Sequence, residues 1–288
     1  MFADKMLRNK LVLVTGGGTG LGKAMAQRFS ELGADIALIG RREEVLATAA
    51  GEISREGGRV FYRICDIRDP ERVATVMREL EAEAGPLDVL VNNAAGNFIS
   101  PSERLSHRAV DAVIDIVLHG TLYCTLEAGK RWIEHGRPGT VLNIVAAYAW
   151  TGSGYVMPSA VAKAGVLAAT RSLAVEWAPH GIRHVAIAPG PFPTEGAWQR
   201  LAPTERLASM MQSRVPLGRV GQPVELANLA AYLISDYAGF INGEVVTIDG
   251  GEWLSGTGFN SLRSLDAEEW DLIRSLAKPG RKDQVPPG

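Results

Sequence analysis

Cysteine is scarce in this chain of 288 residues: Cys65 and Cys124 are the only two, and they cannot form a disulfide framework. Neither sign of charge dominates, because 30 basic residues stand against 32 acidic ones, and this balance argues against a nucleic-acid partner bound through bulk charge. The five histidines show no metal-ligand spacing, so we predict no metal site.

Long apolar runs are absent as well. The longest, such as residues 141–150, fall far below the ~20 residues that a membrane-spanning helix needs. The start of the chain is mixed in charge and contains no apolar run of signal-peptide length. We therefore expect a cytoplasmic protein that is not inserted in a membrane.

Short apolar segments without polar alternation take turns with segments of helical spacing over most of the chain. Continuous apolar strands are typical of a parallel sheet that is covered on both faces. The pattern predicts a single doubly wound Rossmann-type α/β domain of about seven strands. We expect strands at 11–15, 35–39, 60–64, 87–91, 140–145, 182–187 and 244–248, and helices at 21–32, 45–56, 70–84, 108–134, 158–177 and 226–234.

Two segments stand outside this alternation. Residues 1–251 are expected to form the domain, and about 191–217 are an insertion within it that has the length of a functional lid. Residues 252–288 are predicted to be an extension packed on the same domain, with helical spacing near 267–276. The insertion suits an acyl chain or plain packing on the sheet, through Phe192, Trp198, Leu201, Met210 and Met211.

A glycine-rich loop joins the first expected strand to the first expected helix. Glycines let a backbone approach a pyrophosphate closely, and the helix N-terminus adds free N–H groups and a positive dipole end. An ordinary glycine-rich turn is the alternative, because the spacing differs from the usual fingerprint. The dinucleotide hypothesis assigns this contact to Thr15, Gly16, Gly18, Thr19, Gly20, Leu21 and Gly22.

The second expected strand ends without the acidic residue that usually binds the 2′-hydroxyl of an NAD ribose. Arg41 and Arg42 follow instead, and guanidinium groups suit a 2′-phosphate. The sequence therefore favours NADPH/NADP+ as cofactor, with Arg41 the better candidate of the two. Arginines that are merely solvated at a helix start are the alternative.

Together with Asp66 and the segment Asn92–Gly96, this loop resembles the short-chain dehydrogenase/reductase family over residues 10–251. The resemblance implies that Asp66 contacts the adenine and that a turn near Pro189 and Thr194 holds the nicotinamide end. It assigns to cofactor binding, besides the loop and the arginines, Asp66, Ile67, Asn93, Ala94, Ala95, Lys163, Pro189, Gly190, Phe192 and Thr194.

The catalytic positions depart from that family. Most members carry Tyr-x-x-x-Lys, and here Ser159 stands in the tyrosine position, with Lys163 retained. Ala146 occupies the usual serine position, and Val117 the usual asparagine position. A serine hydroxyl is a far weaker acid than a phenol, so ordinary carbonyl reduction is not expected.

This loss is typical of one subgroup, the NADPH-dependent 2,4-dienoyl-CoA reductases, which the chain resembles over nearly its whole length. The likeness rests on 92–101, 151–154, 158–165, 241–243 and 249–252, and on Tyr148. It implies that Tyr148 polarises the thioester carbonyl with help from Asn97, and that Lys163 binds the nicotinamide ribose and favours the phenolate of Tyr148. The resemblance also implies that Ser159 adds a hydrogen bond to this network. The alternatives are a core aromatic for Tyr148 and a turn cap for Asn97.

The resemblance further implies reduction of 2,4-dienoyl-CoA thioesters during unsaturated fatty acid degradation, by a homotetramer. Other reductases, for enoyl-CoA or carbonyl substrates, and a sensor that binds NADPH without catalysis stay open as alternatives. Arginines suit the phosphates of coenzyme A, and an ordinary surface role is the alternative for each such residue. The substrate contacts expected in addition to Arg41 are Arg68, Phe98, Ser106 and Arg200.

Overall fold

The computed structural model describes residues 5–54, 58–194, 204–256 and 258–276. Seven parallel strands form one sheet in the order β3-β2-β1-β4-β5-β6-β7. This order confirms the predicted doubly wound α/β fold. The strands are β1 (Leu11–Thr15), β2 (Asp35–Gly40), β3 (Val60–Ile64), β4 (Val89–Asn92), β5 (Gly139–Ile144), β6 (Ile182–Pro189) and β7 (Val245–Ile248).

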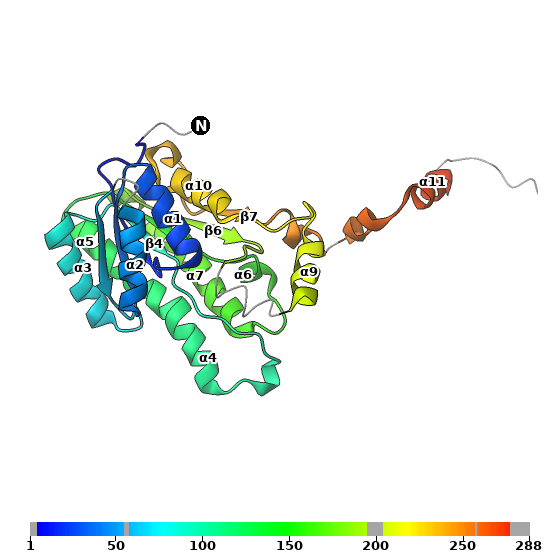
Figure 1. Ribbon diagram of the computed structural model, residues 1–288, viewed down its shortest axis with the longest axis horizontal. Coiled ribbons are helices and arrows are strands. Elements are labelled where there is room, and N and C mark those ends of the chain that lie inside the picture. Colours follow the sequence, from blue (N-terminus) through cyan, green and yellow to red (C-terminus); the bar gives the residue numbers. More distant parts are fainter. Residues whose placement is uncertain (1–4, 55–57, 195–203, 257, 277–288) are drawn as a thin grey trace, which may run out of the picture.

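Helices cover both faces of the sheet, as Figure 1 shows. They are α1 (Gly20–Glu31), α2 (Glu43–Ile53), α3 (Pro70–Ala84), α4 (His107–Ile114), α5 (Gly120–Glu134), α6 (Tyr148–Thr151), α7 (Met157–Glu176), α9 (Glu205–Arg214), α10 (Pro223–Ile234) and α11 (Ala267–Leu276). The predicted helix over 108–134 is interrupted by a π-turn at Asp115–His119, which joins α4 to α5. Val117 lies fully buried in that turn.

Alternate residues of the strands enter two separate cores. Val12 and Val14 of β1 belong to the core under α1, α2 and α10, whereas Leu11 and Leu13 belong to the core under α3 and α5. Each fully buried side chain of this kind contributes about 1.5–3 kcal/mol. Both faces of the strand are therefore apolar, which explains the continuous apolar runs in the sequence.

The order in which strands are added to the sheet reverses between β1 and β4. From β1, the sheet extends toward β2 and β3 on one side and toward β4 and the later strands on the other. The loops that leave β1 and β4 therefore diverge, and in doubly wound folds ligands bind in the crevice that opens there.

The helical region His107–Glu134 is long and apolar enough to cross a membrane by length and composition, with a mean hydropathy of 1.4 over its best window. The sequence predicts no such segment, because its uninterrupted apolar runs are short. Val113 packs on α7, and Cys124 and Trp132 enter the core under the sheet. A buried core helix passes the same test, so this one helix is weak support for a span.

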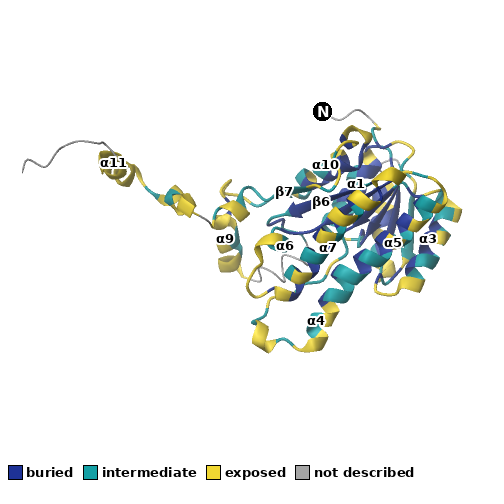
Figure 2. Cartoon of the chain, turned by 180° about the vertical axis from the view of Figure 1, so that it is seen from behind, coloured by how far each residue is buried: buried dark blue, intermediate teal, exposed yellow. Residues whose placement is uncertain are grey.

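The C-terminal extension has two differently placed parts. Arg263 Nη2 donates a hydrogen bond of 2.9 Å to the carbonyl of Ser213, at the end of α9. Helix α11, in contrast, has no buried residue and projects away from the sheet domain in both views (Figures 1 and 2). The sequence predicts an extension packed on the same domain, and in the single chain α11 does not follow that expectation.

Candidate active site

A cavity of about 1760 Å³ opens beside the loops that follow strands β1 to β6, and α9 and the turn after β7 complete its wall. Most residues that the sequence singles out line this cavity. They are Gly16, Gly18, Thr19, Gly20, Leu21, Arg41, Arg42, Asp66, Ile67, Asn93, Ala94, Ala95, Asn97, Tyr148, Lys163, Pro189, Gly190, Phe192 and Thr194.

The loop after β1 is tightly folded around its glycines. Gly16 and Gly20 have φ angles of 65° and 56°, in the left-handed region that glycine adopts without strain. A Cβ atom at Gly22 would lie 2.6 Å from the carbonyl oxygen of Gly16, so the start of α1 touches the loop backbone. Only glycine fits this closeness, which explains why Gly22 matters although it does not line the cavity.

The N-terminus of α1 is left without internal compensation. The side chain of Thr19 at the N-cap accepts no capping hydrogen bond, and the first turn holds no acidic residue. The positive end of the helix dipole therefore faces an uncompensated site, which suits the pyrophosphate of a dinucleotide. The residues present thus fit the cofactor that the sequence implies.

Thr15 joins the two loops that border the cavity. Its Oγ1 accepts hydrogen bonds from the backbone N–H groups of Asn93 and Ala94, at 3.0 and 2.9 Å. The side chain of Asn93 donates in turn to the carbonyl of Thr15 at 3.1 Å. Thr15 does not line the cavity, and its contribution is to fix the separation of the loops that do.

The outer end of the cavity is charged. Asp66 accepts hydrogen bonds from the guanidinium of Arg68, and this bond, with Arg41 nearby, lowers the pKa of the Asp66 carboxyl. Arg41 and Arg42 are exposed where β2 ends. Arg68 is occupied by Asp66 and does not line the cavity, so it braces the proposed adenine contact.

Tyr148 and Ser159 meet at the inner end. The phenol of Tyr148, at the first residue of α6, lies 3.0 Å from the Oγ of Ser159 on α7. Burial raises the pKa of Tyr148, and the hydrogen bond to Ser159 only partly opposes this. Lys163 is expected to favour the phenolate, and burial acts in the opposite direction, because loss of solvent disfavours the anion.

Lys163 is deeply buried at the same end. Its Nζ donates a hydrogen bond to the carbonyl of Ile144, at the end of β5. Burial lowers the pKa of Lys163 to about 8, because the low-dielectric surroundings disfavour the ammonium. Lys163 thus fastens α7 to the sheet with a charge that is lost just above neutral pH.

Asn97 has a free donor at the cavity wall. Its Oδ1 accepts a hydrogen bond of 2.9 Å from the backbone N–H of Phe98, as the turn-cap alternative predicts. Among the described residues, none accepts a hydrogen bond from its Nδ2 group. The amide of Asn97 is therefore able to serve as a cap and as a donor to a ligand at the same time.

A buried ladder of polar side chains, which was not predicted from the sequence, lies beneath the site. Asn92 donates 2.9 Å hydrogen bonds to Thr125 and Asn143, and Asn143 donates a third to Thr170. The ladder ties β4 and β5 to α5 and α7 directly before Asn93 and Ile144. The polar residues that end two apolar strands, Asn92 and Asn143, were its only visible signal.

The substrate wall is formed by α9 and by the turn after β7. Leu207, Met210 and Met211 of α9 line the cavity at helical spacing, followed by Arg214 one turn later. The first three make an apolar surface, as the lid hypothesis expects. Trp253 and Glu252 complete this wall, and neither was singled out as a site residue from the sequence.

None of the four expected substrate contacts is part of the described cavity wall, and Arg68 is the one already placed beside Asp66. Phe98 is 36% exposed and does not line the cavity. Ser106 accepts a hydrogen bond from the N–H of Ala109 and so caps α4. Arg200 lies outside the described residues, as do Trp198 and Leu201.

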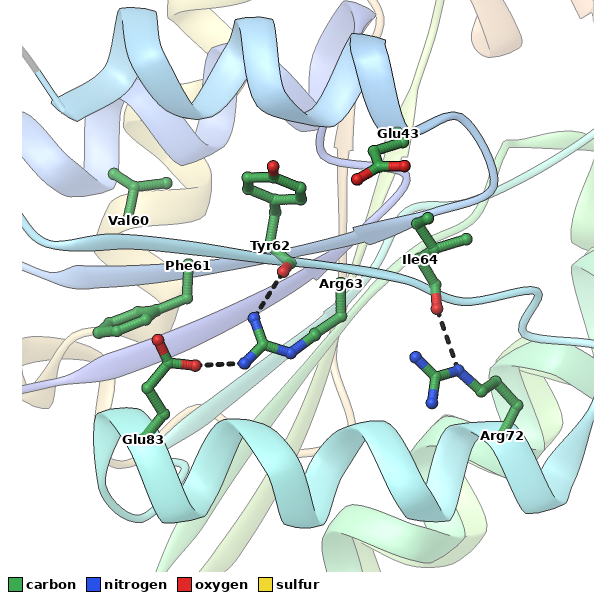
Figure 3. A pocket seen from close by; sticks show the side chains of 8 residues that line it. All are labelled: Glu43, Val60, Phe61, Tyr62, Arg63, Ile64, Arg72 and Glu83. Atoms are coloured by element: carbon green, nitrogen blue, oxygen red, sulfur yellow. Dashed lines mark hydrogen bonds and ion pairs between the residues drawn. The ribbon is translucent and has the colours of Figure 1, made fainter.

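A second cavity of about 440 Å³ lies along β3, the edge strand of the sheet (Figure 3). Arg63 donates to the carbonyl of Tyr62, and Arg72 donates to that of Ile64 at 3.1 Å. These arginines occupy carbonyl groups that a further strand would need, which is a common way to protect a sheet edge. No predicted site residue lines this cavity.

Comparison with known proteins gives concordant similarities. The family model described as enoyl-(acyl carrier protein) reductase matches residues 16–252. A Bacillus subtilis protein named "probable 2,4-dienoyl-CoA reductase [(2E)-enoyl-CoA-producing]" is 45% identical, over 86% of this chain and 98% of its own length. A Caenorhabditis elegans protein named "probable 2,4-dienoyl-CoA reductase 3 [(3E)-enoyl-CoA-producing]" is 43% identical, over 99% of this chain and 94% of its own.

A solved structure provides a fold comparison with a bound dinucleotide. The gluconate 5-dehydrogenase from Burkholderia cenocepacia, in complex with NADP and tartrate, superimposes with a TM-score of 0.82 at 30% identity. The match covers 87% of this chain and 98% of the solved one.

Proposed function

The chain belongs to the short-chain dehydrogenase/reductase family, and we propose that it reduces 2,4-dienoyl-CoA thioesters with NADPH in the degradation of unsaturated fatty acids. One observation carries the proposal. Ser159 stands in the position where the family places its catalytic tyrosine, and the hydroxyl of Tyr148 lies within hydrogen-bond distance of Ser159. Among the described residues of the cavity wall, Tyr148 is the only tyrosine with such a contact.

The cofactor would be held by the glycine loop, by Asp66 and by Lys163, with Arg41 on the 2′-phosphate. When bound, reduced nicotinamide supplies a hydride. The preference for NADPH is supported by the exposed pair Arg41 and Arg42, because β2 ends in Gly40, where an NAD site usually carries an acidic residue. Thr194 lies next to Gly20 and would close the loop over the nicotinamide end.

Tyr148 and Asn97 would stabilise the negative charge that develops on the thioester oxygen. A conjugated dienoyl thioester that gains hydride at its δ-carbon becomes a dienolate, and this oxyanion needs preorganised donors rather than a strong acid. The raised pKa of Tyr148 keeps its O–H available as a donor. The free Nδ2 group of Asn97 supplies a second one.

Ser159 and Lys163 act on that arrangement. Ser159 orients the phenol through its hydrogen bond, and Lys163 holds the end of β5 through the carbonyl of Ile144. The ammonium of Lys163 would bind the ribose of the cofactor. The acyl chain would lie along Leu207, Met210 and Met211 of α9. Contacts of coenzyme A with Arg68, Phe98, Ser106 and Arg200 stay predictions.

We also propose a homotetramer. Large apolar side chains are exposed on the helical layer and near the last strand: Leu126, Val161, Val175, Tyr237 and Phe240. Apolar patches of this kind are typical of subunit contacts. Light scattering coupled to size exclusion measures the subunit number.

The test compares wild type with Tyr148→Phe in NADPH oxidation driven by 2,4-decadienoyl-CoA. Removing one oxyanion donor lowers kcat by about 10²–10³-fold. Tyr155→Phe is the matched control, because Tyr155 lines the same cavity but is 64% exposed. It should leave kcat unchanged, and both variants should bind NADPH like wild type.

Tyr148→Phe with wild-type turnover would contradict the assignment. A wild-type protein that binds NADPH and reduces no thioester would favour the sensor instead. A reductase of enoyl thioesters is the second candidate, and the description of the matching family model favours it. An enoyl thioester also places charge on its oxygen, so comparison of the two substrates separates the candidates.

A further inference from the structure

Among the described residues, Glu252 is the one carboxyl group on the cavity wall that accepts no side-chain hydrogen bond and has only a long ion pair, 3.6 Å from Arg214. The carboxylate of Asp66 is held by Arg68. That of Asp249 accepts hydrogen bonds from the backbone N–H groups of Gly251 and Trp253, at 2.9 and 2.8 Å, and so shapes the turn after β7. Glu252 follows in the same turn, and its side chain is 22% exposed.

Two packing contacts place this turn at the inner end of the cavity. A Cβ atom at Gly190 would lie 2.6 Å from that of Asp249, so the turn touches the segment assigned to the nicotinamide end. On the other side, the rings of Trp253 and Trp150 meet edge to face, with centroids 5.7 Å apart. Trp150 belongs to the same short helix as Tyr148, so the turn that carries Glu252 contacts both the segment assigned to the nicotinamide end and the helix of the expected oxyanion donor.

We propose that Glu252 is the acid that protonates the carbon of the dienolate, a step for which the proposed function assigns no group. This inference rests on the proposed function. Hydride addition at the δ-carbon, with oxidation of NADPH to NADP+, leaves an electron pair shared over the thioester oxygen and the α- and γ-carbons. The O–H bond of Glu252 breaks, a C–H bond forms with that electron pair, and the resulting carboxylate takes a proton from water.

The surroundings of Glu252 suit an acid. Burial raises its pKa, and the nearby carboxylate of Asp249 acts in the same direction. Arg214 opposes this from α9, where its Nε lies 3.6 Å from Oε1 of Glu252. Arg214 is 72% exposed, so solvent weakens its effect. Arg263 faces the end of α9 but donates to the carbonyls of Ser213 and Arg214. Tyr148, Tyr155 and Lys163 are further titratable residues among those described on the cavity wall.

A positioned acid also determines where the proton goes. Protonation at the α-carbon gives the 3-enoyl thioester, and protonation at the γ-carbon gives the 2-enoyl thioester. A single carboxyl at a fixed place reaches one of these carbons, whereas water reaches both. The proposal therefore predicts one product from wild type and a mixture when the acid is removed.

The experiment measures turnover and product composition for wild type, Glu252→Gln, Glu252→Asp and Glu268→Gln with 2,4-decadienoyl-CoA. Loss of a general acid lowers kcat by about 10²-fold in Glu252→Gln. NMR analysis of the products should show a mixture of 2- and 3-enoyl thioesters from Glu252→Gln and a single product from wild type. Glu252→Asp should recover part of the rate and most of the selectivity. Glu268→Gln, on the exposed helix α11, should match wild type.

The pH profile separates catalysis from folding. Wild-type kcat should fall as pH rises through the pKa of Glu252, and this limb should vanish in Glu252→Gln. Arg214→Gln removes the cation that favours the carboxylate, so the limb should move to higher pH. Fluorescence titration with NADPH, expected to be unchanged, reports that each variant is folded.

The proposal is overturned if Glu252→Gln keeps the wild-type rate and a single product, or if it loses NADPH binding together with turnover and Glu252→Asp restores neither. Absence of dienoyl-CoA reduction by wild type contradicts the proposed function itself. The two failures are thus distinguishable, because the second appears before any variant is made.

Discussion

The two ends of the cavity are built in different ways. The nucleotide end uses backbone and glycine: Gly16 and Gly20 turn the chain, and Gly22 lies against the loop. The inner end uses side chains, with Tyr148 on one helix reaching Ser159 on another. A backbone site can hardly be moved within a fold, whereas a hydroxyl can be supplied from a neighbouring element, so the nucleotide end keeps its pattern while the inner end has changed.

The largest effect on cofactor binding is expected at Gly22, in the backbone-built end of the cavity. Gly22→Ala places a Cβ atom 2.6 Å from a backbone oxygen, so the loop must shift, and the affinity for NADPH should fall by about 100-fold or more. Gly51→Ala is the matched control, because nothing lies within 4 Å of a Cβ there. Fluorescence titration measures both, and equal affinities would show that the loop does not need its close contact.

The inner end should show a conflict between stability and function at Lys163. Its pKa of about 8 lies below the ordinary 10.5, so the folded state binds fewer protons than the unfolded state between these values. Stability should therefore rise with pH from about 8 to 10.5. Since each pKa unit corresponds to about 1.4 kcal/mol, the buried charge costs roughly 3 kcal/mol at pH 7.

Lys163→Met should then raise the free energy of unfolding by about 1–3 kcal/mol at pH 7 and by nothing above about pH 10.5, while turnover is lost. Urea denaturation at both pH values measures this. A variant that is less stable at pH 7 would mean that the contact with Ile144 outweighs the buried charge.

Arg41 tests the outer end. Arg41→Ala removes the proposed charge-assisted contact to the 2′-phosphate. It should weaken NADPH binding by about 10–100-fold and leave NADH binding unchanged. Arg104→Ala, an exposed arginine outside the cavity wall, serves as control. If Arg41→Ala weakens both dinucleotides equally, the 2′-phosphate assignment is wrong.

The smallest effect is expected at Ser159. Its hydrogen bond lowers the pKa of Tyr148 against the effect of burial, and one such bond is worth about 0.5–1.5 kcal/mol. Ser159→Ala should reduce kcat by roughly 3–10-fold and keep KM and NADPH affinity. A loss as large as that of Tyr148→Phe would instead make Ser159 a proton donor in its own right.

The fold was predictable because its signals are local and repeated. Apolar runs such as Leu11–Thr15, followed by a glycine-rich turn and a helix, predict each βαβ unit, and chain direction then dictates a parallel sheet. The cofactor loop was predictable for the same reason. The π-turn at Asp115–His119 was not, because nothing in the residue pattern distinguishes it from the helix around it.

The inner end was predicted only in part. Tyr148 and Lys163 could be named by resemblance, but the raised pKa of Tyr148 depends on how much solvent the fold excludes. The ladder from Asn92 to Thr170 joins residues far apart in the chain, and Glu252 acquires its place through packing of the turn after β7. Such properties arise from tertiary contacts, which cannot be read from a single sequence.

The most direct measurement is NADPH oxidation by the wild-type protein with 2,4-decadienoyl-CoA, 2-decenoyl-CoA and 3-ketodecanoyl-CoA at equal concentration. A site that stabilises a dienolate with a protonated phenol should reduce the dienoyl thioester at least about 100-fold faster than the ketoacyl thioester, because the latter requires full proton transfer to an alkoxide. Equal or faster reduction of the ketoacyl thioester would contradict the account.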